Sequence, residues 1–136
     1  MKCLHLIVLR LIVCGSIASC EPFCNVLQVK NQANDTIWIT YSCYPDSSIG
    51  NPKNLVQVPP GGYYAWKTMG EKYVMPKDLV FTLMIVDNDT LRKYGWDEIE
   101  RNNICVKYHI NKEKYERLYG VFIYPPTPHE LDILYH

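Results

Sequence analysis

The sequence contains no apolar run long enough to cross a bilayer as a helix, which needs about 18–20 predominantly apolar residues. The N-terminal stretch LIVCGSIA is far shorter than this, and Arg10 stands directly before it. The chain also lacks an excess of one charge, because 14 Lys and Arg residues balance 14 Asp and Glu residues. Without a basic excess we expect no nucleic-acid partner, and the length of 136 residues is typical of one globular domain.

Motifs for phosphate or metal chemistry are scarce as well. The glycines of PPGGYY open no helix, so they do not form a phosphate-binding loop. His109, His129 and His136 show none of the matched ligand spacings of a metal site. We therefore expect no metal and no other cofactor.

Two sets of residues are candidates for catalytic groups. Cys105 and His109 are four residues apart in a predicted strand, which places them about 13 Å apart and beyond hydrogen-bond reach. Carboxylates within residues 97–100 are the second set, because glycoside cleavage needs two of them across a cleft. Asp97, Glu98 and Glu100 lie early in a predicted short helix, however, where acidic residues suit the helix dipole. We expect a protein without catalytic residues.

The N-terminus of the sequence has the pattern of an export signal. Lys2, His5 and Arg10 make the N-terminus basic, and a short apolar core ending in small residues follows. This arrangement is typical of a signal peptide and predicts an exported domain. Removal of residues 1–19 would leave a net charge of −2, because Lys2 and Arg10 leave with the signal.

The end of the signal, Ile17-Ala18-Ser19-Cys20, resembles a bacterial lipobox. In proteins with this motif the Cys20 thiol would receive a diacylglyceryl group, and cleavage would make Cys20 the acylated N-terminus. Two or three acyl chains anchor a protein stably to a membrane, whereas one does so marginally. The alternative is ordinary signal cleavage after Ala18, which would leave Cys20 available for a disulfide.

The later cysteines and two turn motifs each allow more than one interpretation. Cys24, Cys43 and Cys105 follow Cys20, and four cysteines would allow two disulfides in three connectivities. If Cys20 is lipidated, three remain and their disulfide state stays open. The triplets at 34–36 and 88–90, both Asn-Asp-Thr, match the N-glycosylation pattern, but in a bacterial protein we interpret them as turn residues.

Alternating apolar residues predict short strands in the first half of the chain. Leu27 and Val29 alternate with polar neighbours, as do Ile37 and Ile39, and the intervening NQAND is a turn signal. We therefore expect a β-hairpin in which the paired residue numbers sum to 66. That register sets Cys24 opposite Ser42, and it therefore predicts no Cys24–Cys43 disulfide.

The remaining segments continue the pattern of short strands. Residues 55–58 and 63–67 are predicted strands on either side of the Pro-Pro-Gly-Gly reversal, and residues 79–86, LVFTLMIV, are apolar on both faces and predict an internal strand. Residues 104–110 alternate again. Helices are expected near Asp97 and after Asn111, and a last strand, VFIYPP, follows Gly120. The prediction is a β-sandwich of about seven short strands with two short helices in the C-terminal half.

The motifs NDTIWITYSCYPD, VPPGGYYAW and the stretch from LMIVDNDT to VFIYPP resemble, in this order, small exported lipoproteins of Bacteroidales-type gut bacteria. The resemblance covers nearly all of the chain after the signal. It implies a β-rich domain in the bacterial cell envelope, anchored by lipid to a membrane, most naturally the outer membrane. It supplies no catalytic residues.

Eleven tyrosines and three tryptophans are the one unusual feature of the composition. Exposed aromatic rings stack on sugars or anchor protein partners, and we single out Tyr63, Tyr64 and Trp66 as aromatics that could face a ligand. Because neighbours in a strand face opposite ways, one of the pairs 63/65 and 64/66 should be core and the other exposed.

These patterns together predict a signal peptide at 1–19, a lipid-anchored tether at 20–24 and one globular domain at 25–136. The expected function is that of a non-catalytic interaction or accessory lipoprotein that contacts envelope proteins. The alternative is a glycan-binding module of a nutrient-uptake system.

Overall fold

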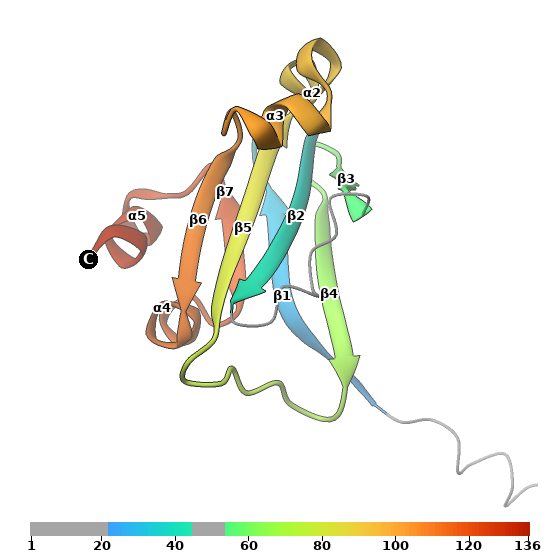
Figure 1. Cartoon of the computed structure of the whole chain (residues 1–136). Coiled ribbons are helices and arrows are strands. Elements are labelled where there is room, and N and C mark those ends of the chain that lie inside the picture. The colour runs from blue at the N-terminus through green and yellow to red at the C-terminus, as the bar shows by residue number, and fades with distance from the viewer. Residues whose placement is uncertain (1–21, 45–53) are drawn as a thin grey trace, which may run out of the picture.

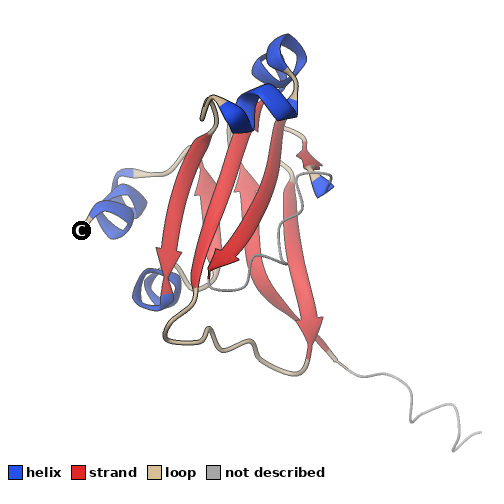
Figure 2. Cartoon of the chain, in the orientation of Figure 1, coloured by secondary structure: helices blue, strands red, loops and turns tan. Residues whose placement is uncertain are grey.

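The computed structural model describes residues 22–44 and 54–136, so the predicted signal and Cys20 lie outside the described part of the chain. Within these residues, seven strands form two β-sheets that face each other, with four short helices at their margins (Figures 1 and 2). The prediction of a mainly β sandwich is therefore confirmed. None of the described helices is long and apolar enough to cross a membrane.

The strands and helices follow one another along the chain with short connections. The strands are β1 (Phe23–Asn31), β2 (Ile37–Tyr44), β3 (Val56–Val58), β4 (Tyr63–Met69), β5 (Val80–Asp87), β6 (Val106–Asn111) and β7 (Val121–Tyr124). The helices are α2 (Asn88–Tyr94), α3 (Trp96–Arg101), α4 (Lys112–Arg117) and α5 (Pro128–Tyr135). Helices α3 and α4 are the two expected ones, and α2 and α5 lie where none was predicted.

The first sheet has the order β4-β1-β7, and the second has the order β3-β2-β5-β6. Strand β1 is antiparallel to β4 and parallel to β7, whereas all pairs of the second sheet are antiparallel. The core lies between the sheets, and each sheet contributes fully buried side chains to it. They include Val29, Phe122, Ile39, Leu83 and Ile110.

The predicted hairpin between β1 and β2 does not form. The two strands lie in different sheets, because β4 and β7 occupy both edges of β1 while β3 and β5 occupy both edges of β2. The predicted register, in which paired residue numbers sum to 66, is therefore wrong. The argument against a Cys24–Cys43 disulfide rested on that register and loses its basis. Cys24 instead pairs in register with Thr68, and Cys43 with Phe81.

Asn31 explains why the turn signal marks a corner between sheets. Its side-chain oxygen accepts a hydrogen bond from the Ala33 backbone N–H at 2.9 Å, which bends the chain away from β1. Its Nδ2 donates to the carbonyls of Asp35 at 2.8 Å and Val58 at 3.0 Å. Through Val58 the buried amide ties the end of β1 to β3 of the other sheet.

Strand β5 is internal, as its uniformly apolar sequence predicts. It pairs with β2 on one side and β6 on the other. Phe81 and Leu83 point into the core between the sheets, while Met84 and Val86 on the opposite face pack with Ile99 of α3. Both faces are therefore covered, and a strand without a polar face is stable there.

The C-terminal elements follow their sequence signals. Asn111 caps α4 by accepting a hydrogen bond from the Lys114 N–H at 2.9 Å, and Gly120 adopts a positive φ of 67° where the chain turns into β7. Helix α5 begins with a capping box between Thr127 and Glu130 and buries Ile133 against the core. Strand β1 begins at Phe23, so the regular domain starts before residue 25, the boundary predicted from the sequence.

Candidate functional site

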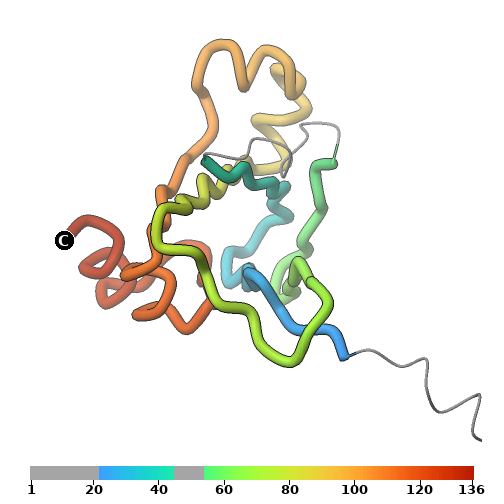
Figure 3. The backbone as a smooth tube through the Cα atoms, turned by 60° about the horizontal axis from the view of Figure 1, so that its bottom comes forward, coloured from blue at the N-terminus to red at the C-terminus, as the bar shows by residue number. Residues whose placement is uncertain are grey.

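A cleft of about 420 Å³ lies at the end of the sandwich where β1 begins. Cys24 and Asn25 of β1 form one wall, residues 71–75 of the loop between β4 and β5 form the second, and Tyr115, Glu116 and Tyr119 form the third. Figure 3 shows this loop crossing from one sheet to the other beside the start of the chain's first strand. We call this site the anchor-end cleft.

Packing against the core fixes the tyrosines of the cleft. The Tyr73 ring stacks on Phe81 with 6.3 Å between ring centroids, and Tyr115 meets both rings edge-on at 5.9 Å. The Tyr115 hydroxyl donates a hydrogen bond to the Val26 carbonyl of β1. A side chain at Gly120 would place its Cβ 2.8 Å from that hydroxyl, so glycine leaves the space that Tyr115 needs.

Burial favours the neutral form of the Tyr73 and Tyr115 hydroxyls. It raises the pKa of Tyr115 to about 12, and it raises the pKa of Tyr73 as well. Near neutral pH these side chains therefore offer ring faces and phenolic O–H groups, and no negative charge. Tyr119 stands at the cleft with 90% of its surface exposed, which leaves its ring open to a ligand.

Charged side chains of both signs complete the lining of the cleft. Glu71 and Lys72 come from the loop, and Glu116 comes from α4, where it lies 3.8 Å from Lys112. Rings beside a few carboxylates and an ammonium group are the features of a site that binds an uncharged polar ligand or a protein segment. No group of three or more His, Cys, Asp or Glu side chains within residues 22–44 and 54–136 could hold a metal ion.

The predicted ligand-facing aromatics Tyr63, Tyr64 and Trp66 do not line this cleft. Tyr64 and Trp66 share one face of β4, where their rings meet edge-on at 5.3 Å and Trp66 packs edge-on against Tyr41 of the core. Tyr63 points to the opposite face and is 68% exposed. The expected division into a core pair and an exposed pair is not seen, because each of the pairs 63/65 and 64/66 has one exposed and one half-buried member. The three rings lie on two faces of β4 and form no continuous strip.

The candidate catalytic residues lie in structural positions. Cys105 is buried with Met84, Val86 and Ile99, and burial raises the pKa of its thiol, which disfavours the thiolate. His109 is exposed and its Nδ1 lies 3.0 Å from the Thr82 hydroxyl on the neighbouring strand. The acidic residues of α3 are all exposed: Asp97 and Glu98 lie in its first turn, and Glu100 follows in the same helix.

The first Asn-Asp-Thr triplet and Asn88 and Asp89 of the second come together at the other end of the sandwich, where they line a depression of about 290 Å³ with Pro60 and Asp87. Asp87 caps α2 through hydrogen bonds from the Thr90 N–H at 2.8 Å and hydroxyl at 2.7 Å, and Asn88 accepts one from the Trp38 indole at 3.0 Å. The interpretation as turn residues is confirmed for the first triplet, which lies in the corner after β1. The second triplet instead forms the first turn of α2.

The sequence patterns did not single out Tyr73, Tyr115 and Tyr119, the tyrosines of the anchor-end cleft. The spacing of Tyr115 and Tyr119, four residues apart after a helix cap, was a signal that both could project from one side of the segment. Tyr73 gave no signal of its own, because it lies in a loop without regular pattern.

No family model, curated protein or solved structure matches the chain. The resemblance to exported lipoproteins therefore stays a prediction, and the structure defines only a class: a β-sandwich domain with a cleft at one end.

Proposed function

We propose that this chain is a lipid-anchored protein of the bacterial cell envelope whose β-sandwich is a non-catalytic interaction domain. The observation that carries the proposal is the anchor-end cleft, with the packed rings of Tyr73 and Tyr115 and charged side chains of both signs. A site of this composition suits binding, because it contains ring faces and hydrogen-bonding groups around an open space. The N-terminal signal and IASC support the envelope location and the anchor at Cys20.

Lipidation of Cys20 is testable by mass spectrometry of the membrane fraction of a bacterial host. We expect the mature chain to begin with acylated Cys20 and the Cys20→Ala variant to leave the washed membrane or accumulate as precursor. Loss of two or three acyl chains removes about 0.8 kcal/mol per buried methylene, enough to abolish stable anchoring. The matched control is Cys24→Ala, which should stay on the membrane. A mature chain that begins at Ser19 with unmodified Cys20 would refute the anchor.

Glycan binding is the second candidate, and the open ring of Tyr119 beside two carboxylates of the cleft favours it. Sugars bind proteins through ring stacking and hydrogen bonds to polar side chains. We expect the lipidated protein in detergent to bind glycans on an array, and Tyr119→Ala to weaken that binding about two- to tenfold, since a ring contact contributes about 0.5–1.5 kcal/mol.

The control for this measurement is Tyr135→Ala, because Tyr135 is a comparably exposed tyrosine on α5 and does not line the cleft. Its substitution should leave glycan binding unchanged. An array without binding, or equal losses for both variants, would favour a protein partner over a glycan.

A further inference from the structure

We propose that the end of the sandwich beside the anchor-end cleft inserts apolar side chains into the membrane surface. The proposal rests on the proposed lipidation of Cys20, and it adds a second contact made by the folded domain itself. Three side chains form this contact: Phe23 at the start of β1, Met69 at the end of β4 and Val74 in the following loop. We call them the membrane rim.

The exposure of these side chains sets them apart from other apolar residues described. Phe23 is 66% exposed, Met69 60% and Val74 64%, and apart from tyrosines every other large hydrophobic side chain within residues 22–44 and 54–136 is less than half exposed. Phe23 and Met69 are direct partners in the β1–β4 register, so they stand side by side. Val74 lines the cleft together with Cys24, the residue after Phe23, so it lies at the same end of the sandwich. Exposed apolar residues gathered at one end mark a surface that meets something other than water.

The place where the chain enters the domain identifies the occupant as a lipid surface. Phe23 is only three residues after Cys20, and three fully extended residues span at most about 11 Å. An acylated Cys20 therefore holds Phe23 within that distance of the headgroup layer. In Figure 1 strand β1 begins at this same end, next to the end of β4.

The charges near the rim fit a surface that inserts without strong electrostatic attraction. The segment from β4 to β5 carries Lys67, Lys72 and Lys77 and, of opposite sign, Glu71 and Asp78. Lysine side chains keep their ammonium groups in the polar layer while their stems lie along apolar material. We therefore expect the contact to depend little on salt, because apolar burial provides most of the attraction.

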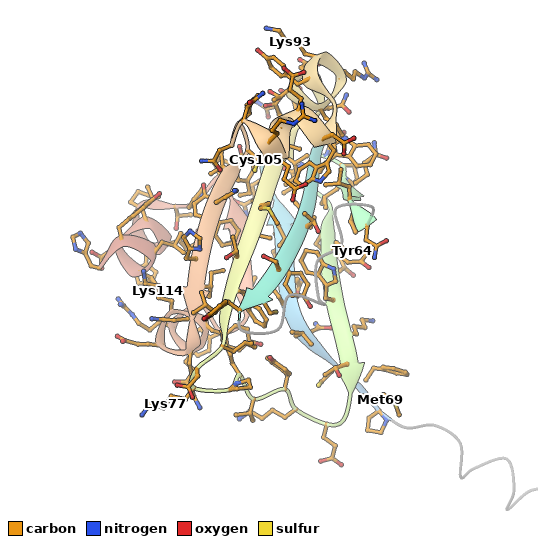
Figure 4. All side chains as sticks on the ribbon, viewed as in Figure 1. Tyr64, Met69, Lys77, Lys93, Cys105 and Lys114 are labelled. Carbon is orange, nitrogen blue, oxygen red and sulfur yellow. The ribbon has the colours of Figure 1, made fainter. Side chains whose placement is uncertain are left out.

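The test uses the lipidated protein reconstituted into vesicles of phosphatidylethanolamine and phosphatidylglycerol, with and without brominated acyl chains as quenchers. Val74→Trp places an indole on the rim. Lys93→Trp is the matched control, because Lys93 is an exposed position on α2 at the opposite end of the sandwich (Figure 4). The unsubstituted protein gives the contribution of the native tryptophans.

Interfacial apolar groups lie about 5–10 Å into the boundary of headgroups and acyl chains, so we expect brominated lipid to quench the added Val74→Trp emission at least about twofold more than that of Lys93→Trp. Equal quenching in protein whose Cys20 is shown to be acylated would overturn the rim alone. Unmodified Cys20 would overturn the anchor and the rim together. If the rim instead pairs two copies of the chain, quenching would be equal for the two variants. The protein would then be a dimer in detergent, and Phe23→Ser would convert it to a monomer. This result would also overturn membrane insertion.

Discussion

Replacing Phe81 by Asp is expected to unfold the domain. Phe81 is 1% exposed in the middle of the core, where its ring contacts those of Tyr41, Tyr73 and Tyr115. Loss of a buried phenylalanine side chain costs about 3–5 kcal/mol, and an unpaired buried carboxylate adds several more. Because whole domains are stable by only about 5–15 kcal/mol, the variant should show no cooperative thermal transition by circular dichroism.

Two further substitutions separate this effect from a general intolerance of β5. Thr82→Asp introduces the same charge at the next residue, where the side chain faces outward beside His109, and it should change the melting temperature little. Phe81→Leu keeps an apolar side chain and should remain folded with a lower melting temperature. A Phe81→Asp protein that melts like the unsubstituted chain would show that β5 is not internal.

Replacing Asn31 by Asp should destabilise the domain by about 3–5 kcal/mol, because it removes a buried donor and adds a buried charge. The Asn31 side chain is 1% exposed, and its Nδ2 donates to the carbonyls of Asp35 and Val58. The substitution leaves both carbonyls facing a carboxylate oxygen. Urea unfolding of the two proteins measures the difference as a lower midpoint with a similar slope.

The exposed Asn34 provides the matched control for this prediction, since it lies in the same corner segment. Asn34→Asp makes the same chemical change at a solvated position, and we expect a difference of less than about 0.5 kcal/mol. Similar midpoints for the variants at 31 and 34 would mean that the amide of Asn31 does not join the two sheets.

The candidate site was less predictable than the fold, and the reason is the long separation between its walls. Cys24, Tyr73 and Tyr115 come from three parts of the chain that meet only when the two sheets face each other. The sequence pointed to Tyr63, Tyr64 and Trp66 because they are close-spaced aromatics in one strand. Alternation correctly divided these three between two faces, but no local pattern shows which face meets a cleft.

The sequence by itself determined which segments are strands and, where apolar and polar residues alternate clearly, which face of the strand is apolar. Ile37, Ile39 and Tyr41 alternate in the sequence and point into the core, and LVFTLMIV lacks a polar face and is internal. These properties depend on neighbours one to four residues apart, so they can be read locally.

Only the tertiary structure decided which strands pair. The turn after Asn31 satisfies the same local hydrogen bonds in a hairpin or in a corner between sheets, and here Nδ2 reaches Val58, 27 residues away. Strand β1 takes β4 and β7 as partners because burying Val29 and Phe122 between two sheets removes more apolar surface from water than a two-stranded hairpin can. Pairing is a property of the whole core, and a local turn signal does not contain it.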